Sequence, residues 1–287
     1  MTESKKRIGY KQTHGKFQWG NAVRRAVVYI ILSIISLLCI FPFIWMVLGA
    51  TSASKDVSSG KLSIGLELIN NFSKLNELIN LPRILANTAV LTICGTIITL
   101  IVASLAGYGF EMYKTRTREK IYNVLLLTMM VPFAAMMIPL FRIFSAAKLL
   151  NNYVAIILPM AASVFVIFYF RQSTKTFAKE LIQAARMDGL NELQAFFYIY
   201  LPTMKSTYAA ASIIVFMSYW NSFLWPLIVL QSNDKKTITL AISSLASSYT
   251  PDYGVIMTAI IIATLPTMIL FFAMQKQFVE GMLGSVK

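Results

Sequence analysis

The chain alternates between long apolar stretches and shorter polar segments. Each apolar stretch is about 20 residues long, which is the length a helix needs to cross a hydrocarbon core roughly 30 Å thick. None shows the alternation of polar and apolar residues that is typical of membrane barrels. The pattern therefore predicts an all-α, polytopic membrane protein with six transmembrane helices. The predicted spans are Ala26–Leu48, Ala86–Phe110, Ile121–Phe144, Asn152–Phe170, Tyr208–Leu230 and Gly254–Met274.

Composition agrees with a membrane protein. Of the 287 residues, 57% are hydrophobic and 13% are charged, whereas about 25% are charged in a typical soluble domain. The polar segments divide the chain into three parts. These are a basic tail over 1–25, a first transmembrane helix with an external loop over 26–84, and a core membrane domain over 85–287.

The net charge of +14 raises the alternative of a nucleic-acid-binding protein. The distribution of the charge argues against it. If the tail is cytoplasmic, most of the 26 lysine and arginine residues lie on its side of the membrane, in the tail and in the segments 111–120 and 171–207. This distribution follows the positive-inside rule. We therefore expect both termini in the cytoplasm, contact with membrane lipid and no nucleic-acid partner.

A polar island interrupts the apolar pattern over residues 171–207. Thr174 or Thr176 is placed to cap a short helix through its hydroxyl. Apolar or small residues then recur at one-face helical spacing, and Gly189 is placed to end the helix in a left-handed conformation. The residues of the predicted face are Phe177, Leu181, Ala184 and Ala185.

A second short helix is predicted directly after Gly189. Asn191 and Gln194 have the spacing of a capping box, and Leu201-Pro202 ends the helix. Its apolar positions are Leu193, Phe196, Phe197 and Tyr200. The two helices predict a helix-turn-helix across the cytoplasmic mouth. Physical reasoning leaves two roles open, a docking surface for a partner protein or an amphipathic re-entry loop at the membrane interface.

The island resembles the EAA loop of importer-type ABC transporter permeases, a Glu-Ala-Ala motif followed by a glycine and a later Pro. The matching residues are Ala184, Ala185, Asp188, Gly189, Ile199, Leu201 and Pro202. Gln183 departs from the family pattern, which has Glu there, and it keeps the hydrogen-bonding reach of Glu but loses the charge. Further matches are Asn87, Ile138-Pro-Leu140, Leu149-Leu-Asn151, Trp220-Asn221, Phe223-Leu-Trp-Pro226 and the tail from Gln277 to Lys287. These are similar to the carbohydrate branch, near the maltose-type second permease subunit.

The resemblance implies a type I importer permease in a bacterial cell membrane, paired with a second permease subunit. It implies that the loop over 176–202 couples to cytoplasmic ATPase subunits, which hold ATP and Mg. The implied coupling residues are Glu180, Gln183, Ala184, Ala185, Asp188, Gly189, Leu201 and Pro202. It also implies an extracytoplasmic solute-binding protein that delivers a sugar or oligosaccharide.

The residues themselves give no indication of an enzyme. The chain has no Gly-x-x-x-x-Gly-Lys-Ser/Thr phosphate loop, and its single histidine, His14, has no neighbours in the sequence that would complete a metal or catalytic site. We expect no catalytic residue, no metal and no cofactor in this chain. Only Glu111 and Arg142 are ionisable within the apolar runs, at their ends. This argues against an ion-driven secondary carrier, which remains an alternative together with a permease for a solute other than sugar.

Polar and aromatic side chains inside the apolar runs are candidate sugar contacts, because amides bind hydroxyls and aromatic rings cover C–H faces. The candidates are Asn87, Tyr219, Trp220, Asn221 and Trp225. Interface anchoring and helix–helix hydrogen bonding are the alternative roles for such residues. Pro132, Pro139, Pro226 and Pro266 also lie in apolar runs, where each can kink a helix.

Overall fold

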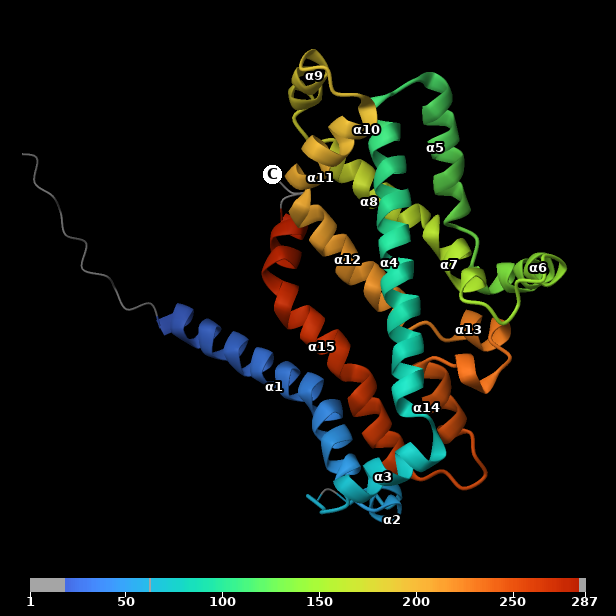
Figure 1. Cartoon of the computed structure of the whole chain (residues 1–287). Helices are drawn as coiled ribbons and strands as arrows, with labels where there is room; N and C mark the ends of the chain where they lie inside the picture. The colour runs from blue at the N-terminus through green and yellow to red at the C-terminus, as the bar shows by residue number, and fades with distance from the viewer. Residues whose placement is uncertain (1–18, 62, 284–287) are drawn as a thin grey trace, which may run out of the picture.

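Helices form all the regular structure in the described part of the chain, residues 19–61 and 63–283 of a computed structural model (Figure 1). The basic tail over 1–18, with His14, lies outside the described residues, and residues 19–25 belong to the first helix. The helices are α1 (Trp19–Ala50), α2 (Ser54–Ser58), α3 (Leu68–Leu78), α4 (Leu81–Met112), α5 (Arg116–Thr128), α6 (Phe133–Ala146), α7 (Val154–Ala161), α8 (Val164–Thr174), α9 (Glu180–Met187), α10 (Glu192–Ala195), the π-helix η1 (Phe196–Tyr200), α11 (Leu201–Thr203), α12 (Lys205–Trp220), α13 (Leu224–Val229), the 3-10 helix η2 (Asn233–Lys235), α14 (Ile238–Ala246) and α15 (Tyr253–Leu283).

Within the described residues, four helical segments are long and apolar enough to cross a membrane by length and composition. They correspond to the first, second, fifth and sixth predicted spans. Their bounds are Val23–Ala50, Leu81–Met112, Lys205–Val229 and Tyr253–Lys276. The count rises to six if each of two bent helix pairs is one span. The two bent pairs correspond to the third and fourth predicted spans.

The third predicted span is not a straight helix. The axes of α5 and α6 differ by 103°, and the break lies between Thr128 and Phe133. Proline has no N–H to donate and disfavours helical backbone in the residue before it. Pro132 occupies this position, directly before the first residue of α6, and it therefore ends the straight course of the span.

The fourth and fifth predicted spans are also interrupted. α7 and α8 meet at a bend of 41°, with Ser163 as the residue before α8. α12 ends at Trp220 and α13 begins at Leu224, and Asn221 caps the end of α12. α8 therefore continues in a new direction from α7, whereas α12 and α13 are separated by a short non-helical link within one span.

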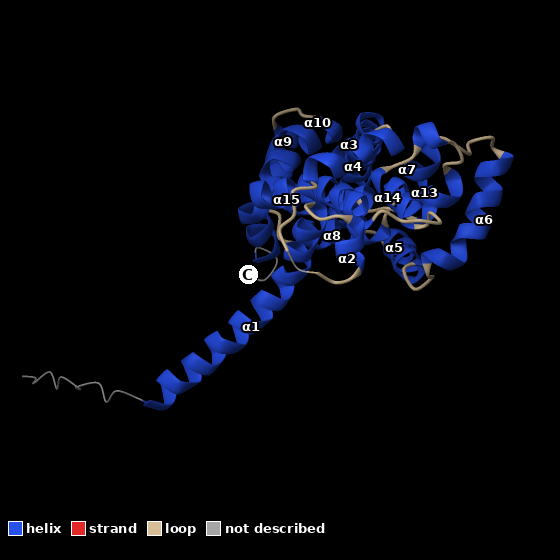
Figure 2. Cartoon of the chain, turned by 90° about the horizontal axis from the view of Figure 1, so that it is seen from below, coloured by secondary structure: helices blue, strands red, loops and turns tan. Residues whose placement is uncertain are grey.

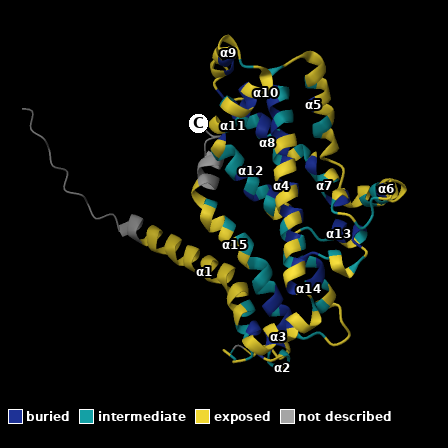
Figure 3. Ribbon diagram, viewed as in Figure 1, coloured by how far each residue is buried: buried dark blue, intermediate teal, exposed yellow. Residues whose placement is uncertain are grey.

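α4 lies at the centre of the bundle and contacts α7, α8 and α12. Two glycines permit these close contacts. A Cβ atom at Gly95 would lie 2.6 Å from the ring of Tyr219 on α12, and one at Gly107 would lie 2.7 Å from the side chain of Phe170 on α8. Small residues let membrane helices approach at such crossings. Buried residues concentrate along these central helices (Figure 3).

α1 and α6 extend from opposite sides of the bundle (Figure 2). Both helices expose most of their apolar side chains in the single chain. Several short helices lie at the two ends of the long helices. α9 and α10 lie at one end with the start of α5, and α2 and α3 lie at the opposite end (Figure 1).

Candidate coupling site

The segment over 176–202, called the hairpin below, lies at the end of the bundle where α4 terminates (Figure 1). Its first helix, α9, buries Ile182 and Ala185, and Phe177 is buried just before it. Leu181 is 43% exposed and Ala184 is also exposed. The predicted apolar face was therefore wrong in two of its four residues. Only one of the two alanines faces outward.

The outward face of α9 consists of mixed polar, small and apolar side chains. Glu180, Gln183, Ala184 and Asp188 are all exposed there. Met187 is 89% exposed and was not singled out from the sequence. The outward face of α9 is therefore mixed in character, with one large apolar side chain among polar and small ones.

The predicted cap at the start of α9 is wrong, whereas the predicted glycine stop after its end is correct. Neither threonine caps it, because Lys179 precedes the helix and no side chain accepts a hydrogen bond there. Thr174 instead donates to the carbonyl oxygen of Phe170 on its own helix. Gly189 has a φ of +82°, so its left-handed conformation is confirmed. Glycine reaches this region without the steric penalty of a Cβ atom.

The second half of the hairpin begins with the predicted capping box. Asn191 accepts a hydrogen bond from the N–H of Gln194, and Gln194 accepts one from the N–H of Asn191, both at 2.9 Å. After one turn the helix widens into the π-helix η1, a form that recurs at functional sites. Phe196 and Tyr200 are buried, as predicted, whereas Leu193 and Phe197 are exposed.

An aromatic cluster fixes the hairpin to the end of α4. The ring of Tyr108 lies 5.3 Å from that of Phe196 and 4.8 Å from that of Tyr200, measured between centroids. Phe177 contacts Tyr200 in the same way at 5.3 Å. Such edge-on aromatic pairs each stabilise by about 0.5–1.5 kcal/mol beyond their buried area. The hairpin is therefore packed directly onto a transmembrane helix.

A polar link joins the same elements at the surface. Tyr113, which follows α4, donates a hydrogen bond to the carboxylate of Glu192. Arg186 on α9 also donates to Glu192, at 2.8 Å. These hydrogen bonds, first that from Tyr113, hold the pKa of the Glu192 carboxyl below its ordinary value. The stabilisation from these two hydrogen bonds is therefore fully present above the ordinary pKa of a Glu side chain. It is lost as the pH falls through the lowered pKa of Glu192, because the carboxylate is then protonated.

A buried ion pair lies beneath the hairpin. Nε of Arg171, at the end of α8, lies 3.4 Å from Oε2 of Glu111 on α4, and both side chains are at most 5% exposed. The same guanidinium contacts the carboxylate of Glu119 on α5 and lies 3.8 Å from the centre of the Tyr122 ring. Arg171 therefore joins α4, α5 and α8 at one point.

Two lysines extend this ion pair to the hairpin. Nζ of Lys114 lies 2.7 Å and Nζ of Lys179 lies 3.7 Å from Oε1 of Glu111. Lys179 directly precedes α9. Glu111 was recognised in the sequence only as a charge at the end of an apolar run. Two of its partners, Arg171 and Lys179, are far away along the chain, and spacing therefore did not indicate them.

Three of the five candidate sugar contacts are part of the core. Tyr219, Trp220 and Trp225 are at most 4% exposed. The Tyr219 hydroxyl pairs with the hydroxyl of Thr99 at 3.0 Å, and each indole N–H donates to a backbone carbonyl of another helix at 2.9 Å. Asn221 is the only exposed residue of the five.

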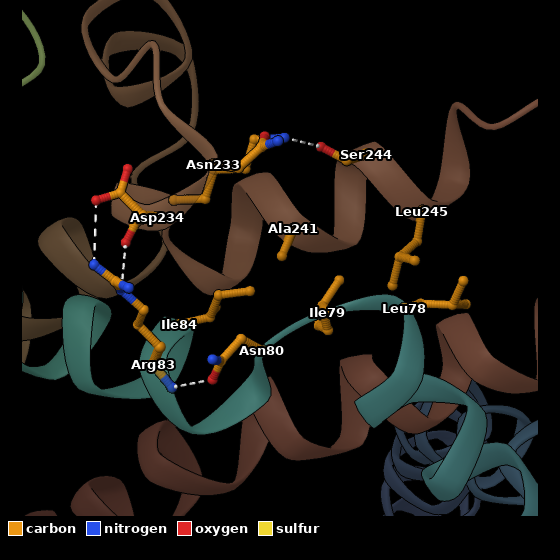
Figure 4. A pocket seen from close by; sticks show the side chains of 11 residues that line it. Leu78, Ile79, Asn80, Arg83, Ile84, Asn233, Asp234, Ala241, Ser244 and Leu245 are labelled. Atoms are coloured by element: carbon orange, nitrogen blue, oxygen red, sulfur yellow. Dashed lines mark hydrogen bonds and ion pairs between the residues drawn. The ribbon is translucent and has the colours of Figure 1, made fainter.

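The fifth candidate, Asn87, fastens the segment between α13 and α14 to α4. Its amide donates to the carbonyl oxygens of Asp234, at 2.8 Å, and Lys236, at 3.2 Å. Arg83 contacts the carboxylate of Asp234 at 3.2 Å and is itself held by Asn80 (Figure 4). Asn80, Arg83, Asp234 and Lys236, but not Asn87, line a pocket of about 480 Å³ at the end of the bundle opposite the hairpin. Asn80, Arg83 and Asp234 thus shape a polar surface there.

No group of three or more His, Cys, Asp or Glu residues in the described ranges could hold a metal ion.

The sequence profile of one protein family, "binding-protein-dependent transport system inner membrane component", matches residues 95–284. The chain belongs to this family. The chain is similar to the lactose transport system permease protein LacG of Rhizobium radiobacter, with 57% identity over 261 residues, 91% of this chain and 96% of that relative. It is also similar to the arabinooligosaccharides transport system permease protein AraQ of Bacillus subtilis (strain 168). That similarity is 35% identity over 276 residues, 93% of this chain and 97% of the relative.

The fold agrees with family membership. A chain in the crystal structure of a bacterial ABC transporter involved in the import of the acidic polysaccharide alginate superposes with a TM-score of 0.82. The two chains are 22% identical, and the match covers 92% of this chain and 99% of the other. The predicted resemblance to importer-type permeases is thereby confirmed. As a member of a family of inner membrane components of binding-protein-dependent systems, the chain is a permease subunit.

Proposed function

We propose that the chain is the permease subunit of an ATP-driven importer for a lactose-type disaccharide or a short oligosaccharide. The observation that carries the proposal is the 57% identity to LacG across nearly the whole length of both chains. The 35% identity to AraQ supports the broader class of oligosaccharides. On this view the chain forms half of the translocation pathway, and a second permease subunit forms the other half.

The hairpin is the proposed contact with a cytoplasmic ATPase subunit, which holds ATP and Mg. Its outward face offers Glu180, Gln183, Ala184, Met187 and Asp188 to such a partner. Its inward face is packed on α4 through the aromatic cluster. Closure of the ATPase would therefore move α4 and α8 together with the hairpin. Nucleotide shifts the access equilibrium only if the ATPase binds one state of the hairpin better than the other.

The remaining coupling residues have supporting roles in this proposal. Ala185 packs inward beneath the docking face, and Gly189 directs the chain into the second half of the hairpin. Leu201 and Pro202 begin α11 and lead the chain back toward the membrane.

We place the hairpin and both termini in the cytoplasm of a bacterial cell, because the positive charges favour this orientation. The opposite end, with α2, α3 and the pocket of Figure 4, then faces the solute-binding protein. Of the proposed pathway residues, Asn221 offers a free polar group to a solute. Tyr219, Trp220 and Trp225 form the wall behind it, and Asn87 holds the external segment.

Affinity purification from native membranes in mild detergent tests the proposal. We expect a second permease and an ATPase subunit to co-elute, identified by mass spectrometry, because the hairpin face and the apolar sides of α1 and α6 need partners. A chain that elutes alone in every detergent, and transports solute when reconstituted alone, would contradict the proposal and indicate a secondary carrier.

A further inference from the structure

Three interrupted helices meet at one place in the bundle. Phe133 is the first residue of α6 after the sharp break. Ser163 lies at the bend between α7 and α8, and Asn221 lies at the link between α12 and α13. Each break falls well inside an apolar run that was predicted as one span. Discontinuous helices of this kind mark the substrate sites of many transporters.

The three breaks line two adjoining pockets. One pocket, of about 380 Å³, is lined by residues that include Phe133, Met160 and Asn221. The other, of about 240 Å³, is lined by residues that include Phe133, Met160 and Ser163. Since Phe133 and Met160 belong to both, the two pockets form one continuous depression. The larger pocket alone falls in the range of about 300–1,000 Å³ that small-molecule sites occupy.

Polar side chains in the depression lack partners within the described residues. Neither the hydroxyl of Ser163 nor the amide of Asn221 makes a hydrogen bond to any described residue. By contrast, the neighbouring hydroxyls of Thr99 and Tyr219 bond to each other at 3.0 Å. A free amide at membrane depth is unfavourable unless a ligand or water satisfies it. In one part of the depression the hydroxyls are hydrogen-bonded to each other, and in another part the side chains of Ser163 and Asn221 remain available to a ligand.

The link that holds Asn221 is itself fixed. Thr239 on α14 donates to the backbone carbonyl of Ser222 at 2.8 Å, and Trp225, two residues after Phe223, is anchored to α7. The backbone on the C-terminal side of Asn221 is therefore anchored by hydrogen bonds to two other helices. Rigid placement of this kind is what a binding group requires.

We infer that Phe133, Met160, Ser163 and Asn221 form a sugar-binding subsite on this subunit. The inference rests on the proposed function and adds the residues that contact the solute. The Asn221 amide and the Ser163 hydroxyl bind sugar hydroxyls, and the Phe133 ring, which is 38% exposed, covers a C–H face of the sugar. The subsite lies where the pathway passes between the two permeases, and it selects solutes by their hydroxyl pattern.

The experiment uses the complete importer in liposomes, with ATP inside and the lactose-loaded binding protein outside. The variants are Asn221→Leu and Ser163→Ala. The matched control is Asn123→Leu, because Asn123 is an exposed amide on α5 that lines neither pocket. Uptake is measured for lactose and for its monodeoxy derivatives, and co-elution of all subunits verifies assembly.

We expect Asn221→Leu to lower lactose uptake roughly fivefold, as the loss of one hydrogen bond predicts. We also expect it to reduce discrimination between lactose and at least one deoxy derivative, because a site that bonds a hydroxyl rejects the analogue without it. A purely structural role would not change this discrimination. Ser163→Ala should do the same for a different hydroxyl, and Asn123→Leu should change neither quantity.

Two outcomes overturn the inference. One is wild-type uptake and discrimination in both pocket variants, and the other is an equal loss in Asn123→Leu. Failure of the wild-type importer to take up lactose or any oligosaccharide is a separate outcome. It would reject the proposed function, and the inference that rests on it would fall as well.

Discussion

Replacing Gly189 by proline is expected to abolish uptake and the stimulation of ATPase activity by the loaded binding protein. Proline holds φ near −65°, whereas Gly189 has a φ of +82°. The substitution also removes the N–H that donates to the carbonyl oxygen of Arg186 at 3.1 Å. Together these losses destabilise the local conformation by about 3 kcal/mol or more. The chain would leave α9 in another direction, and the docking face would be displaced.

Gly60→Pro is the matched control for this prediction. Gly60 also has a positive φ, +75°, and its N–H donates to the carbonyl oxygen of Val57 at 3.1 Å. It lies between α2 and α3, at the opposite end of the bundle from the hairpin. Substrate uptake, stimulated ATPase activity and size-exclusion chromatography are measured for both variants. Normal uptake by Gly189→Pro would contradict the coupling role of the hairpin, and so would an equal loss in Gly60→Pro that is accompanied by normal binding of the solute-binding protein.

Replacing Arg171 by methionine is expected to lower the thermal stability of the purified complex markedly. The change leaves the carboxylate of Glu111 buried without its guanidinium partner. Removing one member of a buried ion pair costs about 3–5 kcal/mol. Lys114 and Lys179 remain beside Glu111, so we expect the lower end of this range. That corresponds to a fall in Tm of roughly 6–12 °C.

Two further variants separate the ion pair from a general effect of lost charge. Arg116→Met removes an exposed arginine on α5 and should change the Tm by less than about 2 °C. Adding Glu111→Gln to Arg171→Met removes the unpaired carboxylate and should recover part of the lost stability. The role of the buried pair is rejected if Arg171→Met unfolds at the wild-type temperature, or if Arg116→Met is equally damaging.

Local chemistry in the sequence predicted much of the hairpin. The stop at Gly189 and the capping box between Asn191 and Gln194 depend on residues within one turn of each other. Both are present as predicted. The apolar face of α9 was predicted less well, because Leu181 and Ile182 are neighbours of equal apolarity. Which of them turns inward depends on the aromatic cluster, and that cluster contains Tyr108, more than 70 residues earlier.

The bends inside the predicted spans and the buried ion pair also could not be predicted from local sequence, because both depend on contacts with distant parts of the chain. Hydropathy indicates where an apolar run begins and ends, but it does not indicate a bend inside the run. Pro132 was recognised as a possible kink, whereas the 103° angle between α5 and α6 depends on packing. Likewise, Glu111 and Arg171 are 60 residues apart, and only the contact between α4 and α8 brings them together.

ATP-driven uptake by the reconstituted complex tests the central claim most directly. The chain and its co-purified partners are placed in liposomes, and accumulation of labelled lactose is measured with and without internal ATP and external binding protein. We predict accumulation against the gradient only when both are present, and none with Gly189→Pro. Equal accumulation without ATP, or accumulation by this chain alone, would contradict the account.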